Sequence, residues 1–227
     1  MGRRVLVVLT SHDNLGNTGN KTGWYLPEVA HPYHVFKAAG YTCDYISPKG
    51  GKAPMDPGSA EQFKDDEICK QFLGDQAVMS QINNTKTASQ VSASDYDVMF
   101  YAGGHGPMYD LPSNTDIAAI ATQVYEKGGI LAAVCHGTVG LVPVKLSSGE
   151  SVLKGQTVTS FSNSEEDAVS LSAVMPFMLE TRLKDLGAKY SAADNFQPHV
   201  CVSGRIITGQ NPASATAMAE AVVKQLA

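Results

Sequence analysis

The stretch ILAAVCHG, residues 130–137, decides the predicted fold of this chain. It begins with an uninterrupted run of small or branched apolar residues and ends in Cys135, His136 and Gly137. A strand that is buried on both faces gives such a continuous apolar run, which is typical of parallel sheets. Ligands of these sheets bind outside the carboxyl ends of the strands. The thiol and the imidazole that end this run are therefore candidate site residues.

Apolar runs and amphipathic stretches alternate along the rest of the chain. Strands are predicted over residues 3–11, 42–48, 97–104, 130–137, 156–161 and 204–209, and helices over residues 26–40, 115–129, 166–180 and 214–227. This alternation predicts an α/β fold with a mostly parallel central sheet and helices on both of its faces. The Gly-rich turn at 103–106 then lies at the same sheet edge as Cys135.

The length and composition suit one domain that covers residues 1–227. Residues 49–96 break the alternation, because they are polar and longer than an ordinary connection. No long Gly/Ser linker brackets them. We therefore predict a polar helical insertion that packs over one edge of the sheet or over the pocket.

Charge and hydropathy exclude several classes of partner. The formal net charge is −5 and Lys and Arg do not cluster, which disfavours nucleic acid. No apolar run approaches the roughly 18 residues that cross a bilayer, so no membrane partner is expected. The opening MGRRVLVVLTS has a short apolar core and is interpreted as a first strand rather than a signal peptide, in a cytoplasmic protein. The cysteines lack CxxC spacing, so neither a zinc motif nor a disulfide framework is predicted.

The Cys-His-Gly corner has the layout of a nucleophile elbow, in which a sharp turn lifts the nucleophile above the sheet. A thiol at a helix N-terminus also gains from the helix dipole, which favours the thiolate. Because neighbours on a strand point to opposite faces, Cys135 and His136 are not expected to act on each other directly. The alternative is that Cys135 only fills space, since free cysteine is among the most buried residue types.

Several motifs in a fixed order resemble the ThiJ/PfpI superfamily, a branch of the class I glutamine-amidotransferase-like fold. They are LTSHDNLGNTGNKTGWYLPEVAHPYHVFKAAG, YAGGHGPMYDLP, AAVCHG, SFSNSEEDAV, PFMLE and TGQNPASA. Within the superfamily, the chain is similar to the branch of glutathione-independent glyoxalases (glyoxalase III) and heat-shock chaperones. The resemblance implies a flavodoxin-like three-layer sandwich with the nucleophile elbow at the carboxyl-terminal edge of the sheet.

The resemblance also implies roles for individual residues. Cys135 is the nucleophile, and Glu28 is the acid beside the thiol that tunes it and moves protons. His136 turns sideways, away from Cys135, and is oriented by an acid further on. That acid is best matched by Glu166, with its neighbours at 165 and 167 left open. Backbone N–H groups of Gly104 and His136 form the oxyanion site.

The second Gly-rich turn adds Gly103 and His105 as candidates for binding the substrate. His31 and His34 share a segment with Glu28 and could in principle bind a metal with it. The chain has no HExxH motif, and His31 is better explained as hydrogen-bonded structure, so no metal and no cofactor are predicted. Of the remaining cysteines, Cys43 and Cys201 are expected in the core and Cys69 partly exposed.

The activity that the resemblance implies is a cofactor-free glyoxalase, working as a homodimer, that converts methylglyoxal to lactate and glyoxal to glycolate. The Cys135 thiolate would attack the aldehyde of this 2-oxoaldehyde to give a hemithioacetal, and Glu28 or His136 would move the proton. This chemistry predicts a thiol pKa lowered from ~8.5 and a nearby carboxyl with a raised pKa. The alternatives are a holdase chaperone, an oxidation-sensing cysteine protein, a protein deglycase, and an amidase or peptidase.

Overall fold

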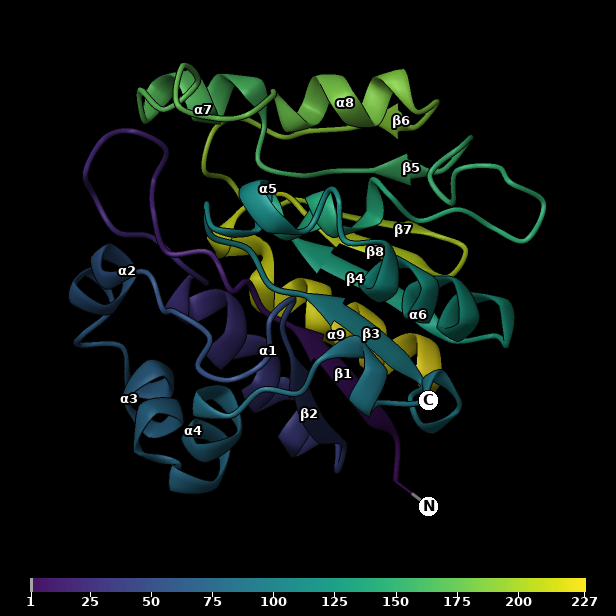
Figure 1. Cartoon of the computed structure of the whole chain (residues 1–227), viewed down its shortest axis with the longest axis horizontal. Coiled ribbons are helices and arrows are strands. Elements are labelled where there is room, and N and C mark those ends of the chain that lie inside the picture. Colours follow the sequence, from purple (N-terminus) through teal and green to yellow (C-terminus); the bar gives the residue numbers. More distant parts are fainter. Residues whose placement is uncertain (1) are drawn as a thin grey trace.

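A computed structural model of the chain describes residues 2–227. Its centre is a sheet with the strand order β2-β1-β3-β4-β8-β7 (Figure 1). All neighbouring strands in this sheet run parallel except β7 and β8. The mostly parallel α/β sheet that the sequence predicts is therefore confirmed. Its strands are β1 (Arg4–Val8), β2 (Thr42–Ile46), β3 (Val98–Tyr101), β4 (Ile130–Val134), β7 (Val200–Ser203) and β8 (Ile206–Gly209).

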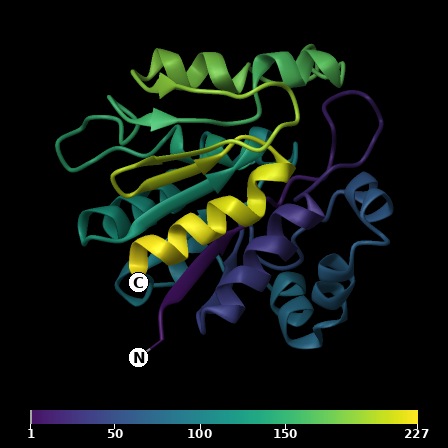
Figure 2. The ribbon, with the colours of Figure 1, turned by 180° about the vertical axis from the view of Figure 1, so that it is seen from behind.

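Helices cover both faces of the sheet, giving three layers. On one face α1 (Leu26–Ala38) and α9 (Ala215–Leu226) lie side by side (Figure 2), and α6 (Thr115–Glu126) lies on the other. Successive strand residues point to opposite faces. Val5 and Val7 accordingly pack in the core under α1 and α9, whereas Leu6 and Val8 pack in the core under α6. This double burial explains why the strands are apolar without alternation.

The segment predicted as an insertion contains three short helices, α2 (Pro57–Gln62), α3 (Glu67–Gly74) and α4 (Gln76–Asn83). Figure 1 shows them gathered beside α1 and β2, at one edge of the sheet. Phe72 and Ile82 on their inner faces join the core beneath α1. This segment therefore forms one wall next to the end of α1 where Glu28 lies.

The strand predicted over residues 156–161 is present but short: β5 (Thr157–Val158) pairs with β6 (Lys189–Tyr190) in a separate two-stranded sheet. The helix predicted over residues 166–180 is wrong. Residues 166–180 do not form one helix, because α7 (Asn163–Ala168) ends early and α8 begins only at Leu179. Ser170 lies at φ 60, in the left-handed region that a continuous right-handed helix does not visit.

Other short elements include α5 (Pro107–Asp110), α8 (Leu179–Asp185) and the 3₁₀ segment η3 (Cys135–Leu141). The antiparallel edge strand β7, which the sequence analysis missed, joins β8 through a tight turn. Within residues 2–227, no helix is both long enough and apolar enough to cross a membrane.

Candidate active site

The carboxyl ends of the central strands meet at one cavity of about 560 Å³. Cys135 follows β4, the Gly103–His105 turn follows β3, and Glu28 lies in the first turn of α1. Glu28, Gly104, His105, Cys135 and His136 all line this cavity. The sheet-edge rule therefore predicted its position correctly.

Cys135 departs from the strand that carries it. Its φ is 57, which puts a non-glycine residue in the left-handed region at the start of η3. Because of this turn, the Cys135 Sγ lies 3.5 Å from Nδ1 of His136. The expectation that the two side chains point apart is therefore wrong. The strand rule fails here because residue 135 no longer has strand geometry.

Glu166 joins two histidines. Its Oε2 accepts a hydrogen bond from Nε2 of His136, and its Oε1 accepts one from Nε2 of His105 at 2.9 Å. Of the three neighbouring acids left open by the sequence, Glu166 is the partner of His136. Glu165 instead forms a capping box with Ser162. The geometry thus resolves this alternative, which spacing alone could not.

The Glu166 contact fixes the tautomer of His136. A carboxylate can only accept hydrogen bonds, so Nε2 of His136 carries the proton. Burial and the neighbouring His105 lower the pKa of His136, which keeps the ring neutral. Burial opposes the ionisation of Glu166. The interactions with His136 and His105 together have the larger effect and hold the pKa of its carboxyl below the usual range. Nδ1 of His136 is then a free base that faces the thiol of Cys135.

Glu28 is fully buried, and burial raises the pKa of its carboxyl to about 8. The Cys135 thiol and the Gly103 N–H lie close enough to favour the ionised form in part. Among residues 2–227, however, neither makes a well-aligned hydrogen bond to the carboxyl oxygens. An unpartnered buried carboxyl is costly to the fold, which marks Glu28 as a functional candidate.

The thiol pKa runs against the sequence-based expectation. Burial, and then the Glu28 carboxylate, raise the pKa of Cys135 well above its ordinary value, whereas a lowered value was predicted. The backbone N–H of His136 lowers the pKa of Cys135, but this effect is smaller than the increase caused by burial. A thiolate and a carboxylate are not both stable in one dry pocket, so the Cys135 thiol stays protonated when Glu28 ionises.

Glycines let the backbone approach the reacting groups. A Cβ on Gly103 would lie 2.2 Å from Oε2 of Glu28, and a Cβ on Gly104 would lie 2.2 Å from the Gly23 carbonyl oxygen. Gly104 also has φ +101, a conformation that side chains disfavour. The backbone N–H of His136 lies beside the Cys135 thiol and can stabilise negative charge there.

Comparison with known proteins identifies the lineage of this site. The model of the DJ-1/PfpI family matches residues 23–225. The chain belongs to the DJ-1/PfpI family. A curated relative in Schizosaccharomyces pombe, named glutathione-independent glyoxalase hsp3102, is 34% identical over 99% of this chain and 98% of its own length.

Solved structures of similar proteins share the whole fold. Glyoxalase III from Candida albicans superposes with a TM-score of 0.89 at 32% identity, over 98% of this chain and 96% of its own. The Francisella tularensis Rapid Encystment Protein 24 kDa superposes with a TM-score of 0.95 at 40% identity, over 99% of both chains. The flavodoxin-like expectation is therefore confirmed.

Sequence reasoning about this DJ-1/PfpI chain missed the aromatic part of the pocket wall. Tyr25, Phe63, Phe161 and Phe196 line the cavity from four separate segments. Phe161 packs against the His136 ring with centroids 4.6 Å apart. No local pattern marks these residues, because their common feature is a cavity that only the fold assembles.

Several other residues singled out in the sequence lie outside this cavity. His34 is exposed on the far side of α1, so it does not join Glu28 in a metal site. Cys69 is completely buried, contrary to the expectation of partial exposure. Cys201 is buried as expected, while Cys43 is only partly buried.

Replacing Gly103 with alanine is expected to displace the Glu28 carboxyl, because the new Cβ would lie 2.2 Å from Oε2 and 2.8 Å from the Val134 carbonyl oxygen. In this DJ-1/PfpI site we expect a loss of about 10²-fold in kcat for 2-oxoaldehydes, as for other small misplacements of reacting groups. Gly74→Ala is the matched control, since nothing lies within 4 Å of a Cβ at that position. Equal activity of the two variants would contradict the close packing.

Glu166→Gln is expected to leave the histidine pair without its shared acceptor and to lower kcat by about 10- to 100-fold. A carboxyl with a lowered pKa contributes stability above its unfolded pKa, and this contribution is lost as pH falls through the folded pKa. The variant should therefore have a lower free energy of unfolding than the wild type at pH 7. Its free energy of unfolding should also fall less steeply as the pH is lowered. Urea unfolding between pH 3 and 7 measures this. Asp167→Asn, on the adjacent acid, should behave like the wild type.

Proposed function

We propose that this protein is a glutathione-independent glyoxalase that converts small 2-oxoaldehydes, methylglyoxal and glyoxal among them, to 2-hydroxy acids. The observation that carries the proposal is the buried thiol of Cys135 between two proton-transfer groups, the Glu28 carboxyl and Nδ1 of His136. Relatives named as glyoxalases match nearly the whole chain, which supports the same reading.

The first step adds the thiol to the aldehyde. Nδ1 of His136, 3.5 Å from Sγ, takes the thiol proton as sulfur bonds to the aldehyde carbon. The carbonyl oxygen receives a proton, so the product is a hemithioacetal with no net loss of atoms. Backbone N–H groups of Gly104 and His136 would stabilise the negative oxygen. This step uses the thiolate only as it reacts, which suits a thiol whose resting pKa is high.

The second step moves a proton along the substrate. Ionised Glu28 removes the hydrogen from the former aldehyde carbon and gives an enediolate. The same proton then returns to the neighbouring carbon, while the hydroxyl proton of the hemithioacetal passes to the neighbouring oxygen. The result is a 2-hydroxy thioester of Cys135. A carboxyl with a pKa of about 8 is basic enough for this task, because burial strengthens it as a base.

Water completes the reaction. Hydrolysis of the thioester releases the 2-hydroxy acid and restores the thiol, so the sum is one aldehyde plus one water. Methylglyoxal gives lactate and glyoxal gives glycolate. Each proton transfer uses a side chain of the pocket, and the carbon that loses hydrogen is oxidised as its neighbour is reduced.

The rival functions draw less support from the same site. A sensor thiol is typically accessible with a low pKa, whereas Cys135 is 5% exposed with a raised pKa. A holdase needs a broad apolar surface. Among the described residues, the large exposed apolar side chains are Leu73 on α3, Val169 and Phe196 at the cavity wall, and Val202 on β7.

The proposal includes assembly as a homodimer, an expectation that comes from the family resemblance. Size-exclusion chromatography with light scattering checks it, and a mass near 24 kDa would contradict it. The assembly is independent of the chemistry above, because every reacting group described lies in one chain.

A glutathione-free assay tests the function. Purified protein is mixed with methylglyoxal, and substrate loss and lactate formation are followed by chromatography. We expect lactate in a one-to-one ratio to the methylglyoxal lost, with no added thiol or cofactor. Loss of methylglyoxal without lactate would indicate simple trapping by protein side chains and would overturn the proposal.

A further inference from the structure

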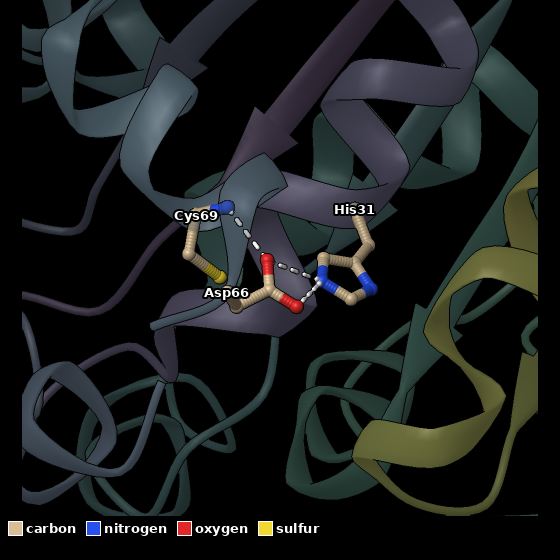
Figure 3. A group of neighbouring side chains, drawn as sticks. All are labelled: His31, Asp66 and Cys69. Carbon is tan, nitrogen blue, oxygen red and sulfur yellow. Dashed lines mark hydrogen bonds and ion pairs between the residues drawn. The ribbon is translucent and has the colours of Figure 1, made fainter. Parts of the chain in front are cut away.

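Three potential metal ligands meet beside the active-site cavity, outside the groups that the glyoxalase steps use. They are His31 on α1, Asp66 just before α3, and Cys69 on α3 (Figure 3). Their ligand atoms all lie within 4.8 Å of one another. Figure 3 shows the Asp66 carboxylate between the imidazole and the thiol.

The spacing of the His31 and Asp66 ligand atoms is close to that of a tetrahedral zinc site, and the Cys69 sulfur lies within 4.8 Å of both. Zinc bonds of about 2.0–2.3 Å to nitrogen, oxygen and sulfur require ligand atoms about 3.3–3.8 Å apart. Nε2 of His31 lies 3.2 and 3.3 Å from the two Asp66 oxygens, which already approaches that requirement. Imidazole, carboxylate and thiolate are also the three ligand types that zinc prefers.

Surrounding hydrogen bonds orient each ligand. The Thr216 hydroxyl lies 3.4 Å from Nδ1 of His31, which leaves Nε2 directed at Asp66. Oδ1 of Asp66 accepts the Cys69 backbone N–H at 2.8 Å, which holds the carboxylate at the start of α3. Partners of this kind on the outer atoms of ligands are a regular feature of metal sites.

The cluster is buried on the Cys69 side and partly open to solvent on the His31 and Asp66 side. Cys69 is completely buried, whereas the His31 and Asp66 side chains are 21% and 27% exposed. His31 also lines the cavity that contains Cys135. An ion can therefore approach from the cavity, and a water molecule can complete a fourth position there.

We propose that His31, Asp66 and Cys69 form a site for Zn²⁺ or a similar divalent transition metal, which ties α1 to α3. This proposal revises the sequence-based expectation of no metal site. The glyoxalase steps do not pass through the ion. The site acts on the fold: His31 lies one turn after Glu28 on the same helix, so the ion would fix the helix that carries the catalytic carboxyl.

Metal binding at this site is linked to proton release. Zinc binds cysteine as the thiolate, so an ion at this site would displace the Cys69 proton to solvent.

A second cluster in the chain must be separated from this one. His105, His136 and Glu166 also lie within ligand distance of one another, but they belong to the active site. An ion there would occupy the lone pair or the acceptor that orients His136. The experiment therefore needs variants of both clusters.

The test is equilibrium dialysis of the chelator-treated full-length protein against Zn²⁺, with the metal content measured by mass spectrometry. We expect one bound ion per chain in the wild type and at least about 100-fold weaker binding in Cys69→Ser and Asp66→Asn. Both changes keep the size of the side chain, and asparagine still caps α3. Co²⁺ as a probe should give a thiolate charge-transfer band that Cys69→Ser abolishes.

The controls are Cys201→Ser and Glu166→Gln. Cys201 is a buried thiol whose sulfur lies 3.5 Å from a histidine nitrogen. Cys201→Ser therefore tests whether Zn²⁺ binds any buried thiol, and this variant should still bind the ion. Glu166→Gln should also retain it. Thermal unfolding of the wild type should shift upward with Zn²⁺, and that shift should vanish in Cys69→Ser.

Three results would overturn the proposal. The first is no bound Zn²⁺ in the wild type at micromolar free metal, which would leave an ordinary hydrogen-bonded trio. The second is binding that persists in both Cys69→Ser and Asp66→Asn. The third is binding that only Glu166→Gln removes, which would assign the ion to the active-site cluster. None of these results bears on lactate formation, so the glyoxalase proposal is judged separately.

Discussion

Replacement of Cys135 by alanine is expected to lower kcat/KM for methylglyoxal by about 10⁴-fold or more, as for other enzymes that lose a covalent nucleophile. Without sulfur no hemithioacetal forms, and neither Glu28 nor His136 has a bound intermediate on which to act. The fold should survive, because Cys135 is a small side chain at the cavity wall. Lactate formation measured by chromatography gives the rate.

The matched control for this prediction is Cys201→Ala. Cys201 is also a buried free thiol, but it lies on β7 and does not line the cavity. We expect full activity from this variant, with circular dichroism showing that both proteins are folded. If Cys135→Ala kept even a tenth of the wild-type rate, the covalent mechanism would be wrong, whatever the behaviour of the control.

Replacement of Glu28 by glutamine is expected to remove activity and to stabilise the protein. The amide cannot accept the substrate proton, so kcat should fall by about 10²- to 10⁴-fold, the usual contribution of a general base. The hemithioacetal should still form, because Cys135 and His136 remain. Rapid-quench mass spectrometry should therefore find methylglyoxal attached to Cys135 in this variant.

The stability gain follows from the raised pKa of Glu28. Its carboxyl has a pKa of about 8 in the folded state and about 4.5 when unfolded. The folded state thus binds more protons between these values, and stability falls as pH rises from about 4.5 to about 8. Glutamine has no such slope. At pH 7 the variant should gain on the order of 2–3 kcal/mol in the free energy of unfolding.

Paired measurements of rate and stability against pH check this prediction. The wild-type kcat/KM should rise toward pH 8 as Glu28 ionises, and the variant should lack this rise. Glu61→Gln is the control, because its side chain is 75% exposed and should change neither curve. A Glu28→Gln protein that is less stable than the wild type at pH 7 would show that Glu28 is not a strained carboxyl.

The fold and the location of the site could be predicted because both depend on local sequence features. The apolar run before Cys135 is long enough to mark a buried parallel strand, and the residues that follow such strands meet at one edge. The motif resemblance then assigned Glu28, which spacing alone could not have linked to a thiol so distant in the chain.

The incorrect predictions concern backbone conformations and burial that the residue types alone do not indicate. Cys135 adopts φ 57, which brings its sulfur to His136, although cysteine has no preference for this region. Ser170 interrupts an apolar pattern that looks helical. The pKa of Cys135 was predicted in the wrong direction because the helix dipole was visible in the sequence, whereas the burial that outweighs it was not.

The aromatic rim of the cavity has a consequence for protein engineering. The proposed reacting groups lie on α1, η3 and α7, whereas the cavity wall also contains Phe63 directly after α2, Val169 directly after α7, and Phe196 in the loop before β7. Val169 and Phe196 are 39% and 47% exposed, so they tolerate replacement better than buried residues. Saturation libraries at these three positions can therefore change which aldehydes the cavity admits, while Cys135, His136 and Glu28 stay unchanged.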